Sequence, residues 1–254
     1  MTATSTPVAL VTGATSGIGR EAARVLAQDG FHVVAAGRDP ARGQAVVESI
    51  LHAGGRAEFR PFDVTSEAAW EAATGELAGR LGRLDALVNS AGIFFARPLP
   101  ETGLAEFRHL WETDVESVVL GTKWGLRRMR ETGSRGSIVN LSSLAGLIGL
   151  EDCAAYCAAK AAVIHFSRIA AIEGAALDPP VRVNALCPGV ILTEMITGAY
   201  GSGPEVEAFV REGNALQIVG EARHVAAAIR YLATARSRMV TGTALVVDGG
   251  RGAD

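Results

Sequence analysis

The chain has few cysteines, few aromatic residues and no excess of positive charge, and each shortage narrows the class of protein. Three cysteines among 254 residues, Cys153, Cys157 and Cys187, form no CxxC pair. This argues against a disulfide framework or a metal site, and we interpret them as small core residues of a cytoplasmic protein. Lysine and arginine number 24 against 27 acidic residues, for a formal net charge of −3, without a basic block. Neither nucleic acid nor an anionic membrane is therefore expected as a partner.

Long apolar stretches are also missing. No uncharged apolar run approaches the ~18 residues that a membrane-spanning helix needs. The N-terminal MTATSTP has neither the basic region nor the apolar stretch of a secretory signal. Apolar material for a core is nevertheless ample, since 48% of the residues are hydrophobic and 20% are charged. We expect one globular domain over residues 1–254.

Short apolar runs alternate with longer helical stretches along the whole chain. Several runs are apolar throughout, as in parallel strands that are covered on both faces. The alternation predicts an α/β fold, a Rossmann-type doubly wound parallel sheet of about seven strands that binds ligands at the carboxyl ends of its strands. The expected strands are residues 7–13, 31–37, 57–64, 84–92, 136–143, 181–189 and 243–250, with helices such as 19–30, 40–55 and 66–82 between them.

One Gly-rich segment, residues 194–217, interrupts this rhythm. It lies between the end of an expected strand and the next long helix. A segment of this length and composition beside the carboxyl ends of the strands predicts a mobile lid over the substrate.

The first expected strand leads directly into TGATSGIG, residues 12–19, where a helix should begin. Glycines at such a junction allow a tight turn and a close approach to a pyrophosphate, and the helix N-terminus offers free N–H groups to the anion. The spacing is G-x-x-x-G-x-G rather than the commoner G-x-G-x-x-G. Because the loop follows the first strand of a βαβ series, we expect it to bind a dinucleotide.

The end of the second strand should select the cofactor. An NAD site usually has an acidic residue here that receives the ribose hydroxyls, but the sequence reads AAGRDP, with Gly37 at that position. Asp39 precedes Pro40 and is expected to cap the next helix. Arg38 is then free to bind a 2′-phosphate through its planar guanidinium. NADP is therefore the expected cofactor, with NAD as the alternative.

The segment YCAAK, residues 156–160, places Tyr156 and Lys160 one helical turn apart among small residues. Side chains at i and i+4 share one face of a helix. An isolated YxxxK pattern is common and has no functional meaning by itself. The remaining motifs decide how it is interpreted.

Together with NSAG (89–92), the serine pair 142–143, PGVILTEM (188–195) and TGTALVVDGG (241–250), the two motifs resemble the short-chain dehydrogenase/reductase family. The resemblance extends from about Val8 to Gly250, with every motif in order. The one mild departure among these motifs is NSAG, which has Ser90 where the family has a second Asn. This position mainly supports the central strand, so no loss of function is expected.

The resemblance implies catalytic roles. Tyr156 would be the acid in carbonyl reduction and the base in alcohol oxidation. The Lys160 ammonium would lower the pKa of the phenol, ordinarily ~10, and bind the nicotinamide ribose. Ser143 would bond the substrate oxygen, with Ser142 as its rival. The family also has an Asn that holds a proton-relay water. Asp114, in WETDVESV, stands at that position, one water away from the Lys160 backbone.

The resemblance also implies a set of cofactor contacts. The glycine loop would hold the pyrophosphate, residues at the ends of the next strands would line the adenosine and ribose, and the segment after the sixth strand would face the nicotinamide. No metal is expected. The residues are Gly13, Thr15, Ser16, Gly17, Ile18 and Gly19 in the loop; Arg38, Asp63, Val64, Asn89, Ala91 and Gly92 at the adenosine side; and Tyr156, Lys160, Pro188, Gly189, Ile191 and Thr193 at the nicotinamide side.

Apolar residues near the expected catalytic strand ends predict a hydrophobic ketone or secondary alcohol, with cyclic compounds among the candidates. No Arg or Lys is expected to face a substrate carboxylate or phosphate. The candidates are Ile93, Phe94, Phe95, Leu144, Leu147, Ile148, Leu150, Met195, Ile196 and Tyr200.

These features predict an NADP-dependent oxidoreductase that interconverts a ketone and a secondary alcohol. One alternative is a ketoreductase that acts on a carrier-bound acyl or polyketide chain. The other is a non-catalytic nucleotide-binding scaffold, which the presence of Tyr156 and Lys160 disfavours. The helix that follows Tyr156 is apolar on more faces than one sheet can cover, which favours burial by a second subunit, together with the helix that contains Trp124. The resemblance implies a homotetramer.

Overall fold

The computed structural model describes residues 6–253 and contains one seven-stranded sheet. All its strands are parallel, in the order β3-β2-β1-β4-β5-β6-β7. The strands are β1 Val8–Thr12, β2 His32–Gly37, β3 Arg56–Pro61, β4 Ala86–Asn89, β5 Ser137–Leu141, β6 Arg182–Pro188 and β7 Ala244–Val247. The predicted fold class and all seven strands are confirmed. Each strand is shorter than expected, mostly because residues that were predicted at its end belong to the following loop.

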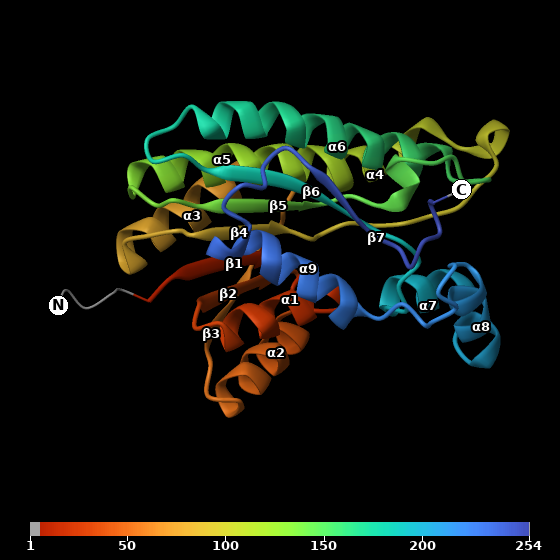
Figure 1. The fold of residues 1–254 in the computed structure, drawn as a ribbon, viewed down its shortest axis with the longest axis horizontal. Helices are drawn as coiled ribbons and strands as arrows, with labels where there is room; N and C mark the ends of the chain where they lie inside the picture. Colours follow the sequence, from red (N-terminus) through yellow and green to blue (C-terminus); the bar gives the residue numbers. More distant parts are fainter. Residues whose placement is uncertain (1–5, 254) are drawn as a thin grey trace.

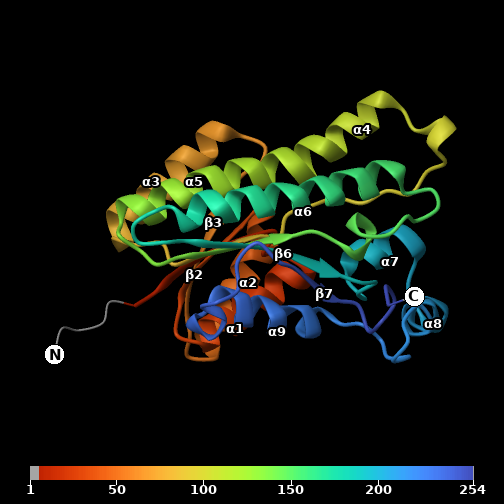
Figure 2. The ribbon, with the colours of Figure 1, turned by 45° about the horizontal axis from the view of Figure 1, so that its top comes forward.

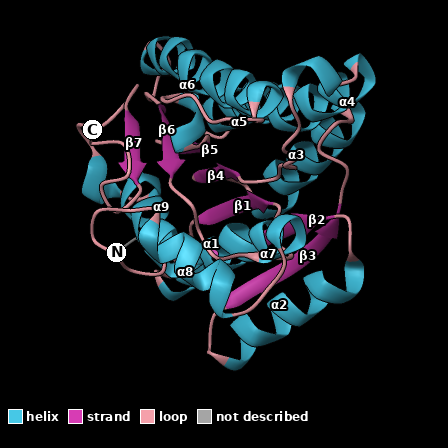
Figure 3. Cartoon of the chain, turned by 90° about the vertical axis from the view of Figure 1, so that its right-hand side faces the viewer, coloured by secondary structure: helices cyan, strands magenta, loops and turns pink. Residues whose placement is uncertain are grey.

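Helices cover both faces of the sheet, as Figures 1 and 3 show. One layer holds α1, α2 and α9, and the other holds α3, α4, α5 and α6. The helices are α1 Gly17–Gln28, α2 Pro40–His52, α3 Glu67–Leu81, α4 Leu104–Trp111, α5 Ser117–Glu131, α6 Ala154–Ala175, α7 Glu194–Tyr200, α8 Pro204–Glu212 and α9 Ala222–Ala233, with short 3₁₀ turns at Leu99–Glu101, Leu144–Gly146 and Ala235–Ser237.

The core follows from the two-residue period of the strands. In β1, Ala9 and Val11 pack into the cluster beneath α1 and α9, while Val8 and Leu10 pack into the cluster on the opposite face. Every residue of β1 is buried. Side chains of successive residues point to opposite faces, so a central strand covered on both faces must be apolar at nearly every position.

One helix meets the length and hydropathy criteria for a membrane span among the described residues. It is α6, and 44% of its most apolar window is buried inside the fold. The helix packs against β6 and carries Lys160 toward the carboxyl ends of the strands. Core packing accounts for only part of its hydropathy, because Ile169 and Ile172 of the same helix are exposed.

A π-helical turn, Glu112–Glu116, joins α4 to α5 without a break in the helix. It contains Asp114. Ser117 Oγ donates a hydrogen bond to the carbonyl of Thr113 over 2.5 Å, and Thr113 Oγ1 donates to the carbonyl of His109 over 3.0 Å. Such turns accommodate one extra residue and are frequent at functional sites.

The segment predicted as a lid contains the two short helices α7 and α8 with a Gly-rich link between them. Figure 2 shows both helices at one end of the molecule, with the C-terminus beside them. The tail contacts the stretch after α8, where Leu216 N donates to the carbonyl of Gly249 over 3.0 Å. The mobility of residues 194–217 stays a prediction.

Candidate active site

The loop between β1 and α1 is shaped as a close backbone turn. Gly13 has a φ of +64°, and a Cβ there would lie 2.8 Å from the backbone N of Ala91. A Cβ on Gly19 would lie 2.3 Å from the carbonyl O of Gly13. Only glycine permits these approaches, which bring the loop against the end of β4 and the start of α1. The result is a backbone cradle that fits a pyrophosphate group.

A carboxylate already occupies the N-terminus of α1. Gly17 N donates to Glu194 Oε2 over 3.0 Å, and Arg20 Nη1 donates to Glu194 Oε1 over 2.8 Å. Burial by itself raises the pKa of Glu194, but backbone hydrogen bonds and Arg20 outweigh it and leave the pKa below its ordinary value. This helix end therefore stabilises an anion, as a dinucleotide site requires. The sequence did not indicate the Glu194 contact.

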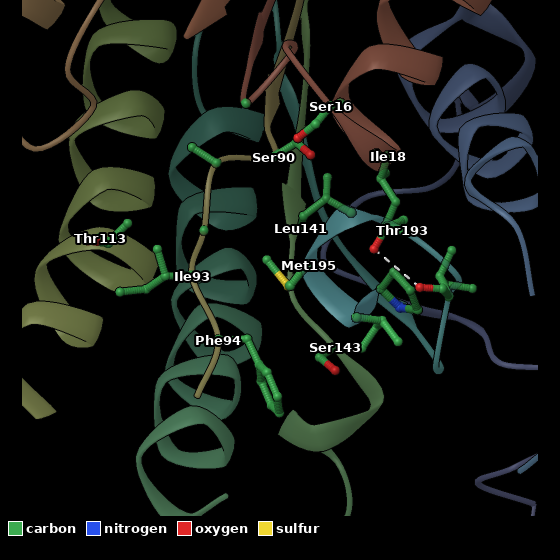
Figure 4. Close-up of a pocket in the computed structure, with 18 of the residues that line it drawn as sticks. Ser16, Ile18, Ser90, Ile93, Phe94, Thr113, Leu141, Ser143, Thr193 and Met195 are labelled. Atoms are coloured by element: carbon green, nitrogen blue, oxygen red, sulfur yellow. Dashed lines mark hydrogen bonds between the residues drawn. The ribbon is translucent and has the colours of Figure 1, made fainter. Parts of the chain in front are cut away.

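A cavity of about 850 Å³ runs along the carboxyl ends of the strands. It brings together the predicted cofactor residues with one exception, Asn89. Figure 4 shows Ser16 and Ile18 near the start of α1, and Ser143, Thr193 and Met195 around the same space. The predicted residues that line it are Gly13, Thr15, Ser16, Gly17, Ile18, Gly19, Arg38, Asp63, Val64, Ala91, Gly92, Ser143, Tyr156, Lys160, Pro188, Gly189, Ile191 and Thr193.

Asn89 has its side chain in the interior instead. It is buried, and its Nδ2 donates to Asn140 Oδ1 over 2.8 Å. Asn140 in turn donates to Ser167 Oγ on α6 over 3.0 Å. This polar chain ties β4 and β5 to α6. We expect Asn89 to support the cofactor site through these bonds rather than through a side-chain contact.

The adenosine end of the cavity contains Arg38 and Asp63, as the sequence predicted, and also Arg42, which it did not predict. Asp39 caps α2 by accepting from the backbone N of Arg42 over 3.1 Å. Arg38 therefore remains at the cavity, close enough to Asp63 to help lower the pKa of that carboxyl, although hydrogen bonds from Thr65 are the larger cause. Arg42 also lines the cavity, but an ion pair of 3.4 Å joins it to Asp39.

Tyr156 and Lys160 lie on the cavity face of α6, with Ser143 across from them after β5. Lys160 Nζ lies 5.4 Å from the centroid of the Tyr156 ring. A hydrogen bond between Ser143 and Tyr156 contributes to lowering the pKa of the phenol. Ser142, the rival, donates its hydroxyl to the carbonyl O of Lys160 over 2.7 Å. Ser143 is therefore the serine of this pair whose hydroxyl can donate a hydrogen bond to a substrate.

Asp114 lies directly against Lys160, which corrects the expectation of an intervening water. Asp114 Oδ2 is 2.8 Å from Lys160 Nζ, an ion pair rather than a well-directed hydrogen bond. Its Oδ1 accepts from the backbone N of Ile93 over 2.8 Å. The carboxylate is 0% exposed and the ammonium is 6% exposed. The sequence predicted a water between Asp114 and the Lys160 backbone. In the structure, Asp114 lies on the π-helical turn and its carboxylate contacts Lys160 Nζ instead.

These charges set the protonation of the site. Burial is the largest influence on Tyr156 and raises the pKa of its phenol; Lys160 lowers it, and Asp114 raises it again. Burial alone would lower the pKa of Lys160, but Asp114 and Tyr156 more than compensate and raise it. Lys160 is therefore an ammonium at neutral pH, and the net effect leaves the phenol protonated. The site holds a proton that it can donate.

The substrate end is mostly apolar, as predicted, with Phe94 packed edge-on against Tyr156 at a ring-centroid distance of 5.0 Å. Phe95, Leu147 and Ile148 do not line the cavity; Leu147, for example, is 45% exposed on the outside. The sequence missed Cys153, Phe209 and Arg251, which do line it. Arg251 is thus a basic residue in the cavity that the sequence did not indicate, and whether it faces a substrate anion stays a question for experiment. The candidates that line the cavity are Ile93, Phe94, Leu144, Leu150, Met195, Ile196 and Tyr200.

Comparisons with known proteins agree with this geometry. The family model described as "Enoyl-(Acyl carrier protein) reductase" matches residues 13–251. Cyclopentanol dehydrogenase of Comamonas sp. is 36% identical, with 96% of each chain covered. Cis-4-hydroxycyclohexanecarboxylate dehydrogenase of Sinomonas cyclohexanicum is 39% identical, and NADP-dependent (R)-specific alcohol dehydrogenase of Lentilactobacillus kefiri is 35% identical; both alignments cover 96% of this chain and 95% of the relative.

Among solved structures, a short-chain dehydrogenase/reductase from Burkholderia xenovorans superposes with a TM-score of 0.91 at 35% identity, covering 98% of this chain and 97% of that one. The chain therefore belongs to the short-chain dehydrogenase/reductase family. It is an oxidoreductase that acts on the CH–OH or C=O group of its substrate.

Proposed function

We propose that the protein is an NADP-dependent enzyme that interconverts a hydrophobic cyclic ketone and its secondary alcohol. One observation carries the proposal. Ser143, Tyr156 and Lys160 meet beside an apolar chamber in the same cavity that contains the pyrophosphate cradle at its other end. Its relatives support the substrate class, since one is named for cyclopentanol and another for a hydroxycyclohexane ring.

In the reducing direction, the bound nicotinamide would supply a hydride to the carbonyl carbon. Ser143 Oγ would hold the carbonyl oxygen, and the Tyr156 phenol would donate its proton to that oxygen as negative charge develops on it. The Lys160 ammonium stabilises the phenolate that remains, and Asp114 keeps Lys160 charged. In the oxidising direction the same phenolate would remove the hydroxyl proton.

Arg38 would select NADP through the 2′-phosphate. It lies at the adenosine end of the cavity, and no acidic residue takes the place of Gly37 at the end of β2. Arg42 is the second guanidinium there, but its ion pair with Asp39 already engages it. Arg38 is therefore expected to make the larger contribution.

Replacing Arg38 with Ala should weaken NADPH binding by about 1.5–3 kcal/mol, as for a hydrogen bond to a charged group, while NADH binding stays nearly unchanged. Fluorescence titration with each cofactor measures this. Arg42→Ala is the matched control and should cost less. An equal loss for both cofactors, or a wild-type preference for NADH, would contradict the assignment.

The proposed reaction is tested by the turnover of NADPH and NADH against ketones. The panel contains cyclopentanone, cyclohexanone, linear ketones and a ketoacyl chain on its carrier protein. We expect the cyclic ketones to be the better substrates. The description of the family model keeps a carrier-bound substrate as the second candidate, and turnover of the ketoacyl chain alone would favour it.

We also propose a homotetramer. Two large apolar side chains on the outer face of α6 are exposed, Ile169 at 47% and Ile172 at 70%. Burial of such residues in a two-fold interface with α5 is favourable. Sedimentation velocity at micromolar concentration should give a tetramer; a single species of 26.3 kDa would contradict it. A cytoplasmic location stays a prediction.

A further inference from the structure

Arg251 is a cation at the substrate end of the cavity. Its side chain lines the cavity, and its Nη1 is buried without a hydrogen bond to any residue within 6–253, although the residue as a whole is only partly buried. No ion pair to Arg251 forms within this range either. A buried polar atom without a hydrogen-bond partner is costly, so its retention in a cavity points to a ligand that completes it.

The surrounding residues leave space for the guanidinium instead of binding it. Gly213 follows α8, and a Cβ there would lie 2.6 Å from Arg251 Nη1. Asp248, which directly follows β7, accepts from the backbone N of Gly250 and of Gly252, each over 2.8 Å. Glu194 is bonded to Gly17 and Arg20. Asp248 and Glu194 therefore have partners other than Arg251.

The other cations that line the cavity lie next to acidic residues. Lys160 is paired with Asp114, and Arg38 and Arg42 lie with Asp39 and Asp63 at the adenosine end. Arg251 is thus the cation left for a substrate among the described lining residues. Glu151 also lines the cavity, close to Cys153 along the chain. It is exposed to solvent and makes no ion pair within residues 6–253, so it does not pair with Arg251.

A row of aromatic rings separates Arg251 from the catalytic phenol. Phe94 lies 5.0 Å from Tyr156, Tyr200 lies 6.1 Å from Phe94, and Phe209 lies 5.5 Å from Tyr200, between ring centroids. A Cβ on Gly213 would lie 2.6 Å from Arg251 Nη1 and 3.0 Å from the carbonyl O of Phe209, which places the guanidinium near the Phe209 end of this row. The cation is therefore at the far side of an apolar surface that begins at Tyr156.

We propose that Arg251 binds a carboxylate of the substrate, on a carbon remote from the one that exchanges the hydride. The substrate class is then a cyclic hydroxy acid and its keto acid, with the ring on Phe94 and Tyr200. This inference rests on the proposed reaction and leaves its chemistry unchanged. Arginine suits the role because its planar fork matches both carboxylate oxygens.

The kinetic test compares 4-oxocyclohexanecarboxylate with its carboxamide, which has the same shape without the charge. Wild-type enzyme should prefer the acid in kcat/KM by ~10-fold or more, as for a charge-assisted hydrogen bond. Arg251→Gln should remove the preference through a KM for the acid that rises much more than the KM for the carboxamide. Arg251→Lys should retain part of it. The control is Arg211→Gln, which removes an exposed arginine of α8 that does not line the cavity.

A binding test does not depend on turnover. Cyclohexanecarboxylate and cyclohexanecarboxamide are titrated calorimetrically into enzyme saturated with oxidised cofactor. The acid should bind ~10-fold or more tightly than the amide, and Arg251→Gln should abolish the difference. Gly213→Ala should reduce it, because the added methyl group displaces the guanidinium while its charge remains.

The outcomes separate the two proposals. Equal binding of acid and amide to the wild type, or a difference that persists in Arg251→Gln, would overturn the role of Arg251. Turnover of cyclohexanone would still support the proposed reaction in that case. If none of the ketones is reduced, but the acid binds through Arg251, then the proposed reaction fails and the carboxylate site stands.

Discussion

Tyr156→Phe should lower turnover by ~100-fold or more, while NADPH continues to bind. The substitution removes the proton donor and little volume, so the ring can still pack edge-on against Phe94. Loss of a positioned acid typically costs 10²–10⁴-fold in rate. Steady-state turnover of a cyclic ketone, together with a cofactor titration, measures both effects.

The matched control is Tyr231→Phe, which removes a phenolic hydroxyl from the outer surface of α9, where Tyr231 is partly exposed. It should behave as the wild type. Turnover of Tyr156→Phe within a few-fold of the wild type would mean that another group supplies the proton. A parallel loss of cofactor binding would instead indicate that the phenol holds the ribose.

The second large effect should come from Asp114. Asp114→Ala leaves the Lys160 ammonium buried without its counter-charge, and breaking a buried pair in this way costs about 3–5 kcal/mol in the free energy of unfolding. Activity should also fall by roughly tenfold or more. Urea denaturation at pH 7 measures the stability. Because the folded-state pKa of Lys160 is raised above its ordinary 10.5, the contribution of the pair is fully present at neutral pH and is lost only as pH rises through the folded value.

Asp114→Asn separates charge from shape. The amide oxygen can still accept from the backbone N of Ile93, so the loop should keep its position. Asp114 raises the pKa of Tyr156, and removal of its charge should therefore lower the pKa of the phenol. Oxidation depends on the phenolate, so the pH profile of alcohol oxidation should move to lower pH over the range in which Lys160 is charged. This range narrows in the variant, because Asp114 no longer raises the pKa of Lys160. An unchanged profile, with wild-type stability in Asp114→Ala, would remove Asp114 from the site.

The sequence predicted best what the local backbone determines. The glycine loop and YCAAK each lie within one strand–helix unit or one helix, so their spacing predicted the local geometry, and the resemblance to the family then implied that Gly13, Tyr156 and Lys160 share one site. Asp39 was correctly predicted as a helix cap because Pro40 follows it. The expected strand 84–92 was too long, since hydrophobicity does not mark where β4 stops at Asn89.

The sequence predicted poorly those side-chain positions that depend on tertiary contacts. Asn89 follows an apolar strand like a ligand-binding residue, yet its side chain bonds Asn140 from another strand. The direct contact of Asp114 with Lys160 depends on a π-helical turn that no residue pattern marks. Arg251 lies in the tail after β7, and only the contact of that tail with the segment after α8 brings it to the cavity.

The π-helical turn also sets the rotational phase of a long helix. Each residue advances an α-helix by about 100°, so one extra residue at 112–116 rotates the apolar stripe of α4 by that angle relative to the stripe of α5. In the structure α4 packs on α6, whereas α5 packs mainly on α3 and β4 and to a smaller extent on α6. Deletion of a single residue here would bring the two stripes into phase and turn residue 114 away from Lys160. The length of this turn is therefore constrained as tightly as the identity of the carboxylate it carries.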